Sequence, residues 1–158
     1  MLRMLLALVV MSISSICLAV DAEDQAALNQ CIATWGAKSP FTKGTPPAKV
    51  FSTGVKVFGI GNAAQDEDIT DKPSLILVHP AVNVLGKTTI WLANPNGWYC
   101  FRSNVTVLGK IAIEAQCDAH IASARDEGTA VAAVDESNKG VSVFGVLRIT
   151  RFGCKKSP

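Results

Sequence analysis

The chain has 158 residues, with fifteen Lys and Arg against thirteen Asp and Glu and a formal net charge of +2. This length accommodates one domain with a single core. Because acidic and basic residues are interspersed, the sequence shows neither the basic stripe of a nucleic-acid-binding protein nor a polybasic membrane patch. We therefore expect no nucleic acid among its partners.

Residues 1–19 have the layout of a secretory signal peptide. Arg3 supplies a basic start, an apolar run follows over 4–11, and Ala19 is a small residue suited to cleavage. The apolar run is too short to span a bilayer, so we expect no transmembrane span after cleavage. A lipoprotein acylated at Cys17 is the alternative, but the residues before this cysteine do not fit the usual pattern. We expect a secreted protein, periplasmic or extracellular, of about 139 residues.

A short capping helix is predicted within 20–36. Asp21 or Asp24 can cap its start, and Gly36 ends it. Its apolar residues recur at helix spacing and form one stripe. They are Ala27, Leu28, Cys31, Ile32 and Trp35. The prolines and glycines over 37–49 then predict an extended linker.

The rest of the chain, 50–158, is predicted to be a β domain with an internal repeat. Val and Ile recur there at every second position, which is typical of strands. The pattern Val-x-Val, then Phe or Leu, then Gly occurs four times. Its copies are 55–59, 82–86, 105–109 and 141–145. In three of them the alternation continues past the glycine, so we expect a bent continuous strand there rather than a hairpin.

Two architectures fit this repeat. In an all-β, short right-handed β-solenoid (a β-helix) of about four coils, each repeat is one coil with glycine at the bend. In an antiparallel β-sandwich, the segments on either side of the glycine are hairpin arms. The continuous alternation favours the solenoid, and the N-terminal helix would then cap the open end of the stack.

The repeats, together with the block Asn94-Pro95-Asn96-Gly97-Trp98-Tyr99-Cys100 and the later Cys117, resemble bacterial exported β-solenoid proteins of uncharacterised function. The resemblance covers 50–152 and lies in the pattern alone. It implies a right-handed parallel β-helix-like fold and transfers no catalytic residue.

Four cysteines remain after cleavage, which in an exported chain indicates two disulfides. They are Cys31, Cys100, Cys117 and Cys154. Cys117 and Cys154 follow their repeat glycines at similar distances, which would place them on neighbouring coils. We therefore prefer Cys31–Cys100 with Cys117–Cys154, and Cys100–Cys117 stays open as an alternative. No second pair of close-spaced ligands accompanies Cys117 and His120, so we expect no zinc site.

An acidic segment offers weak calcium candidates. Asp66, Asp68 and Asp71 could supply carboxylate oxygens, but the segment lacks the glycine and the spacing of an EF-hand loop. We prefer a solvated loop, with no metal bound.

Three aromatic residues near a polar turn are candidates for ligand binding. Trp91, Trp98 and Tyr99 could form a platform on which a sugar ring stacks. The preferred alternative is that Trp98 closes the core and Tyr99 finds a hydrogen-bond partner.

The residue before each repeat glycine is large and apolar, and the four form a candidate partner interface. They are Phe58, Leu85, Leu108 and Phe144. If the paired valines face inward, these residues face outward as a ladder that could mediate self-association. If the backbone turns at the glycine, they enter the core, and the sequence favours this second arrangement.

No catalytic constellation stands out in the sequence. His79 and His120 lack a recognisable nucleophile context. Carboxylates such as Glu114 and Asp118 leave a glycosidase pair open. We expect a non-enzymatic structural or binding module of the envelope or extracellular space, without a cofactor. The alternative is a protein that binds or acts on polysaccharide through the aromatic patch, so the expected partners are envelope polysaccharide, another protein or a second copy.

Overall fold

The computed structural model describes residues 20–52, 55–79, 82–102, 105–106, 108–124 and 146–155. The helix α1 spans Ala22–Trp35, and a single 3-10 turn follows at Gly36–Lys38. The strands are β1 (Lys49–Ser52), β2 (Val55–Asp66), β3 (Ser74–His79), β4 (Val82–Leu92), β5 (Gly97–Arg102), β6 (Val105–Thr106), β7 (Lys110–Gln116), β8 (His120–Ala124) and β9 (Val146–Phe152). The expected signal peptide and the fourth repeat lie outside the described residues.

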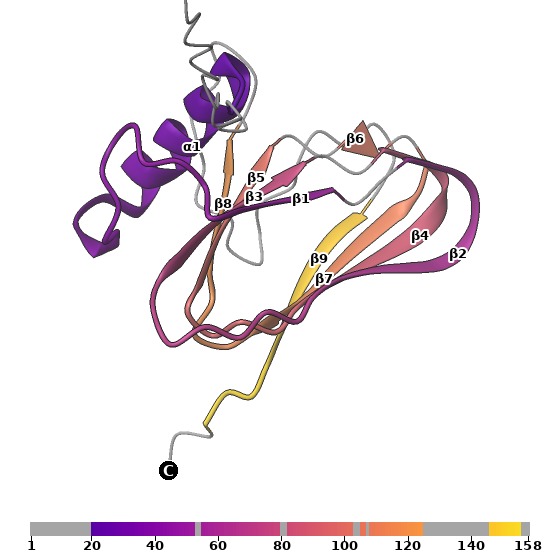
Figure 1. Ribbon diagram of the computed structural model, residues 1–158. Coiled ribbons are helices and arrows are strands. Elements are labelled where there is room, and N and C mark those ends of the chain that lie inside the picture. Colours follow the sequence, from indigo (N-terminus) through magenta and orange to yellow (C-terminus); the bar gives the residue numbers. More distant parts are fainter. Residues whose placement is uncertain are drawn as a thin grey trace, which may run out of the picture.

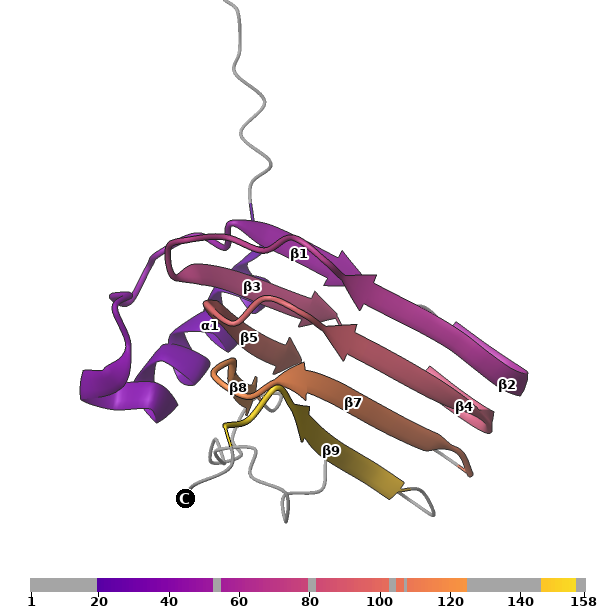
Figure 2. The ribbon, with the colours of Figure 1, turned by 90° about the horizontal axis from the view of Figure 1, so that it is seen from below.

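The strands form two sheets in which the described strand pairs are all parallel (Figure 1). From β1 to β5 successive strands alternate between the two sheets, whereas β6 and β7 both pair with β4. One sheet has four strands in the order β1-β3-β5-β8, and the other has the order β2-β4-β7-β9, with β6 also pairing with β4. Figure 2 shows the two sheets side by side, each descending from its first strand, β1 or β2, to its last.

The main core lies between the two sheets. The four-stranded sheet contributes Ile76, Val78, Tyr99, Phe101 and Ile121, and the other sheet contributes Ile90, Leu92, Ile111, Ile113 and Ile149. Their burial stabilises the fold by about 25 cal/mol for each Å² of apolar surface removed from water.

The helix packs on the outer face of the four-stranded sheet. Leu28, Cys31 and Ile32 are buried in a second cluster, separate from the core between the sheets. The sheet contributes to it Leu75, Leu77, Trp98, Cys100, Ala122 and Ala124. The order of layers is therefore helix, sheet, sheet. No helix within the described ranges is long and apolar enough to cross a membrane.

The predicted fold is wrong. We expected a β-solenoid of about four coils with the helix over its open end, whereas the helix covers a sheet face in an α/β-like arrangement of two parallel sheets. The antiparallel sandwich is also wrong, because the described strand pairs are parallel. The physical reason lies in β3 and β5, whose apolar residues are buried on both faces, so that a second layer must cover the sheet.

The helix itself is confirmed. The Asp21 side chain caps it by accepting a 2.7 Å hydrogen bond from the backbone N–H of Asp24. Gly36 ends it with a φ of 57°, a conformation that favours glycine.

The bent continuous strand predicted for the second repeat is confirmed, because β4 continues through Gly86. In the third repeat β6 ends at Thr106 and β7 begins at Lys110, and the fourth repeat lies outside the described residues. β2 also continues through Gly59, and Gly59 and Gly86 are partners in the parallel register. Gly59 has a φ of 122°, and a Cβ on Gly86 would lie 2.7 Å from the backbone oxygen of Gly59. Glycine is therefore required at both positions by backbone conformation and close approach.

The preferred disulfide pairing is confirmed. Cys31–Cys100 joins α1 to β5, and both cysteines are fully buried. Cys117–Cys154 joins the turn between β7 and β8 to the segment after β9. Each bridge is expected to contribute about 2–4 kcal/mol to stability.

Candidate functional site

A cavity of about 530 Å³ lies beside β1. It is lined by Ala48, Lys49, Asp66, Asp68, Thr70, Ser74, Ile76 and Asn94. Lys49 begins β1, Asp66 ends β2 and Ser74 begins β3, so both sheets contribute to the lining. The volume lies within the range of small-molecule sites.

Asp66 is the fully buried polar centre of this region. Its Oδ1 atom accepts a 2.8 Å hydrogen bond from Lys49 Nζ, and its Oδ2 atom accepts a 2.7 Å bond from the Tyr99 hydroxyl. Hydrogen bonds to Asp66 and Asp68 raise the pKa of Lys49. Burial, followed by the bond to Asp66, raises the pKa of Tyr99. At neutral pH Lys49 is therefore an ammonium and Tyr99 a neutral phenol.

Among the weak calcium candidates, Asp68 and Asp71 are exposed on a loop as we preferred, whereas Asp66 is not. Asp66 is buried, and the Lys49 ammonium lies between it and Asp68, at 2.5 Å from Asp68 Oδ2. Asp71 is exposed and does not line the cavity. A cation at this position would have to displace the ammonium. Within the described ranges, no group of three or more His, Cys, Asp or Glu side chains could hold a metal.

Asn94 fixes another wall of the cavity. It is fully buried, and its side-chain oxygen accepts a 3.0 Å hydrogen bond from the backbone N–H of Asn96. Its Nδ2 atom donates to Thr70 Oγ1 at 3.2 Å. Both side chains are therefore held in place by hydrogen bonds.

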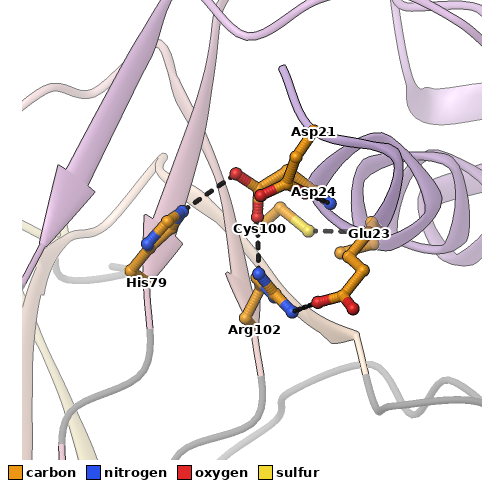
Figure 3. A network of polar contacts seen from close by, with 7 residues as sticks. Asp21, Glu23, Asp24, His79, Cys100 and Arg102 are labelled. Atoms are coloured by element: carbon orange, nitrogen blue, oxygen red, sulfur yellow. Dashed lines mark hydrogen bonds and ion pairs between the residues drawn. The ribbon is translucent and has the colours of Figure 1, made fainter. Parts of the chain in front are cut away.

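A second polar cluster lies under the first turn of α1 (Figure 3). Asp24 is only 6% exposed and accepts hydrogen bonds from His79 Nε2 at 3.0 Å and from Arg102 Nη1 at 2.7 Å. Arg102 Nη2 also contacts the exposed Glu23 at 2.9 Å. His79 ends β3 and Arg102 ends β5, so the cluster fastens the helix across the ends of two parallel strands. We assign it to anchoring the helix.

Trp98 and Tyr99 do not form an exposed platform. Trp98 is 5% exposed, stacks on His120 with ring centroids 3.7 Å apart, and meets Trp35 edge to face at 5.2 Å. Tyr99 is fully buried between the sheets. The preferred alternative is therefore confirmed: Trp98 is buried in the cluster beneath the helix, and the Tyr99 hydroxyl has a hydrogen-bond partner in Asp66. Burial, followed by the positive charges of Arg151 and Lys38, lowers the pKa of His120.

Trp91 lies apart from the other two aromatic residues. Ile90 and Leu92 point into the core, so the alternation of β4 directs Trp91 to the outer face of its sheet. It is partly buried there and stacks on Phe152, with ring centroids 4.3 Å apart. The three aromatic candidates therefore do not form one site.

Three of the four candidate interface residues are exposed, and we call them the apolar row. Phe58 is 74%, Leu85 45% and Leu108 52% exposed. Phe58 and Leu85 are register partners, and the backbone N–H of Leu108 donates a 3.2 Å hydrogen bond to Val84. The favoured inward orientation is wrong for these residues, because the strands bend at glycine without turning the row into the core. Phe144 lies outside the described residues.

The cavity was missed at the sequence level. Lys49 lies 17 residues from Asp66, and Asn94 lies 24 residues from Thr70. No periodic or short-range pattern joins such residues, because their proximity depends on which strands become neighbours. Only the acidic segment around Asp66 gave a signal, as a weak calcium candidate beside the preferred solvated loop.

No family model, curated protein or solved structure matches the chain. Its function is therefore argued from the residues described above.

Proposed function

We propose that this protein is an exported structural module that assembles with a second copy of itself through the apolar row. The single observation that carries the proposal is the exposure of three large apolar side chains on β2, on β4 and between β6 and β7, with Phe58 exposed by 74%. Contiguous apolar surface of this kind is typical of interaction sites. The two disulfides and the signal-peptide pattern of the sequence support export.

A second copy suits this row because a two-fold contact is self-complementary. In such a contact the same surface patch serves on both subunits, so an apolar row can pack on its own copy without a matching charge pattern. Burial of an apolar side chain on association is favourable by about 25 cal/mol for each Å² removed from water.

A flanking charge sets the salt dependence of this contact. Lys87 is exposed on β4 and lies two residues after Leu85. A two-fold contact through the row brings the Lys87 side chains of both copies toward each other, and salt screens such repulsion. We expect association to strengthen as ionic strength rises.

Sedimentation velocity over a concentration series tests the proposal. The wild-type protein should show a reversible dimer that Leu108→Lys abolishes, because the substitution places a charge in the row. Ile69→Lys is the matched control, since Ile69 is 70% exposed on a loop away from the row, and it should dimerise normally. A wild-type monomer at every concentration and salt, or a dimer that Leu108→Lys leaves intact, would contradict the proposal.

A further inference from the structure

We propose that the cavity beside β1 is a binding site for a neutral, hydroxylated ligand of the size of one sugar ring. This site shares no residue with the apolar row, so it can be tested independently of self-association. Its volume of about 530 Å³ lies within the range of small-molecule sites, so it can hold a sugar ring.

The polar walls of the cavity are organised before any ligand arrives. Asp66 and Asn94 are fully buried, and each is held by at least two hydrogen bonds. Lys49 is held from two sides by carboxylates. A ligand that binds here pays little to order these groups, which favours affinity.

The remaining hydrogen-bonding capacity matches hydroxyl groups. An ammonium has three N–H donors, and Lys49 uses two of them on Asp66 and Asp68. The Asp68 side chain is 72% exposed and offers acceptor capacity beside that ammonium. Adjacent hydroxyls of a sugar can accept from the ammonium and donate to the carboxylate, since each hydroxyl does both.

The apolar residues and the net charge of the cavity restrict the class of ligand further. Ala48 and Ile76 line the same cavity and can pack against the C–H face of a sugar ring. Two carboxylates against one ammonium leave the cavity with a net negative charge, which disfavours anionic ligands. We therefore expect neutral sugars to bind better than the corresponding uronates.

Protein-detected NMR titration provides the test. Methyl glycosides of glucose, galactose, mannose and N-acetylglucosamine are added separately to the full chain, with glucuronate and galacturonate as charged counterparts. At least one neutral sugar should shift the amide signals of residues 48–49, 66–70, 74–76 and 94, and its uronate should bind more weakly. The absence of shifts with every neutral sugar, shifts that map elsewhere, or equal binding of the uronate would overturn the proposal.

A matched pair of variants tests whether Asp68 contributes to sugar binding. Asp68→Ala should weaken binding of that sugar by about tenfold, the loss expected for a hydrogen bond to a charged group. Asp71→Ala is the control, because Asp71 is an exposed aspartate three residues away that does not line the cavity. Both positions are on the surface, so both variants should fold, which their amide spectra will show. Equal affinities of the two variants would contradict the assignment.

Discussion

The hydroxyl of Tyr99 donates a 2.7 Å hydrogen bond to Asp66 Oδ2, and this contact joins the two sheets inside the protein. Tyr99 lies on β5 and Asp66 ends β2, and both residues are fully buried. Because the second oxygen of Asp66 binds Lys49 at the cavity, the same carboxylate links the core to the proposed ligand site.

Tyr99→Phe should therefore destabilise the protein without altering its fold. The substitution leaves the ring in the core but removes the only described donor to Asp66 Oδ2, and a buried acceptor without a partner costs about 1–3 kcal/mol. Urea unfolding should show this loss as a lower midpoint with an unchanged m-value. A stability equal to that of the wild type would show that water or another group replaces the hydroxyl.

Tyr99 should also resist ionisation at high pH. It is the only tyrosine in the chain, so ultraviolet absorbance reports its phenolate without interference from another tyrosine. Burial and the bond to Asp66 raise its pKa above the usual value of about 10. The folded state thus holds this proton more tightly than the unfolded state, and its stabilising contribution is complete below about pH 10 and declines above it.

An alkaline titration followed by absorbance and by circular dichroism tests this prediction. Phenolate absorbance should rise only as the protein unfolds at alkaline pH, so that absorbance and circular dichroism change together. Ionisation near pH 10 with the circular dichroism spectrum unchanged would contradict the buried hydrogen bond.

Asp24 and its neighbour Glu23 offer a matched comparison at the start of α1. Asp24 is buried and binds His79 and Arg102, whereas the Glu23 side chain is 81% exposed and contacts Arg102 alone. Asp24→Ala should cost about 3–5 kcal/mol, because it leaves both Arg102 and His79 without the buried carboxylate that they share. Glu23→Ala should cost less than about 1 kcal/mol. Thermal or urea unfolding measures both, and similar losses would contradict the anchoring role of Asp24.

Local sequence patterns predicted part of this structure well. The cap at Asp21, the stop at Gly36 and the apolar stripe of the helix depend on neighbouring residues, and all three are observed. The register of Gly59 with Gly86 follows from the repeat because equivalent residues of parallel strands align. These features could be read from spacing alone.

The layers could not be read from the same patterns. The run Leu75–Val78 in β3 is buried on both faces, which is typical of a sheet with a layer packed on each side. The repeat pattern instead predicts that the helix covers the open end of a solenoid. The cavity depends on Lys49, Asp66 and Asn94, which come from separate parts of the chain. Sequence periodicity places a residue on a face of its own strand and does not show which distant side chain it meets.

The two disulfides should differ in their access to reductant. Both cysteines of the Cys31–Cys100 bridge are fully buried, whereas Cys154 is exposed and Cys117 is partly exposed. Thiol–disulfide exchange requires a thiolate to reach a sulfur atom. A mild dithiol at native conditions should therefore reduce Cys117–Cys154 and leave Cys31–Cys100 intact.

Alkylation followed by peptide mass mapping distinguishes the two bridges. With time, the labelled cysteines should be Cys117 and Cys154, and labelling of Cys31 and Cys100 should require denaturant. The paired variant Cys117→Ser with Cys154→Ser serves as the control, because its remaining bridge should resist the same dithiol completely. Reduction of both bridges at equal rates in the native protein would contradict this prediction. It would mean that the helix separates from the sheet often enough to expose Cys31–Cys100 as well as Cys117–Cys154 is exposed.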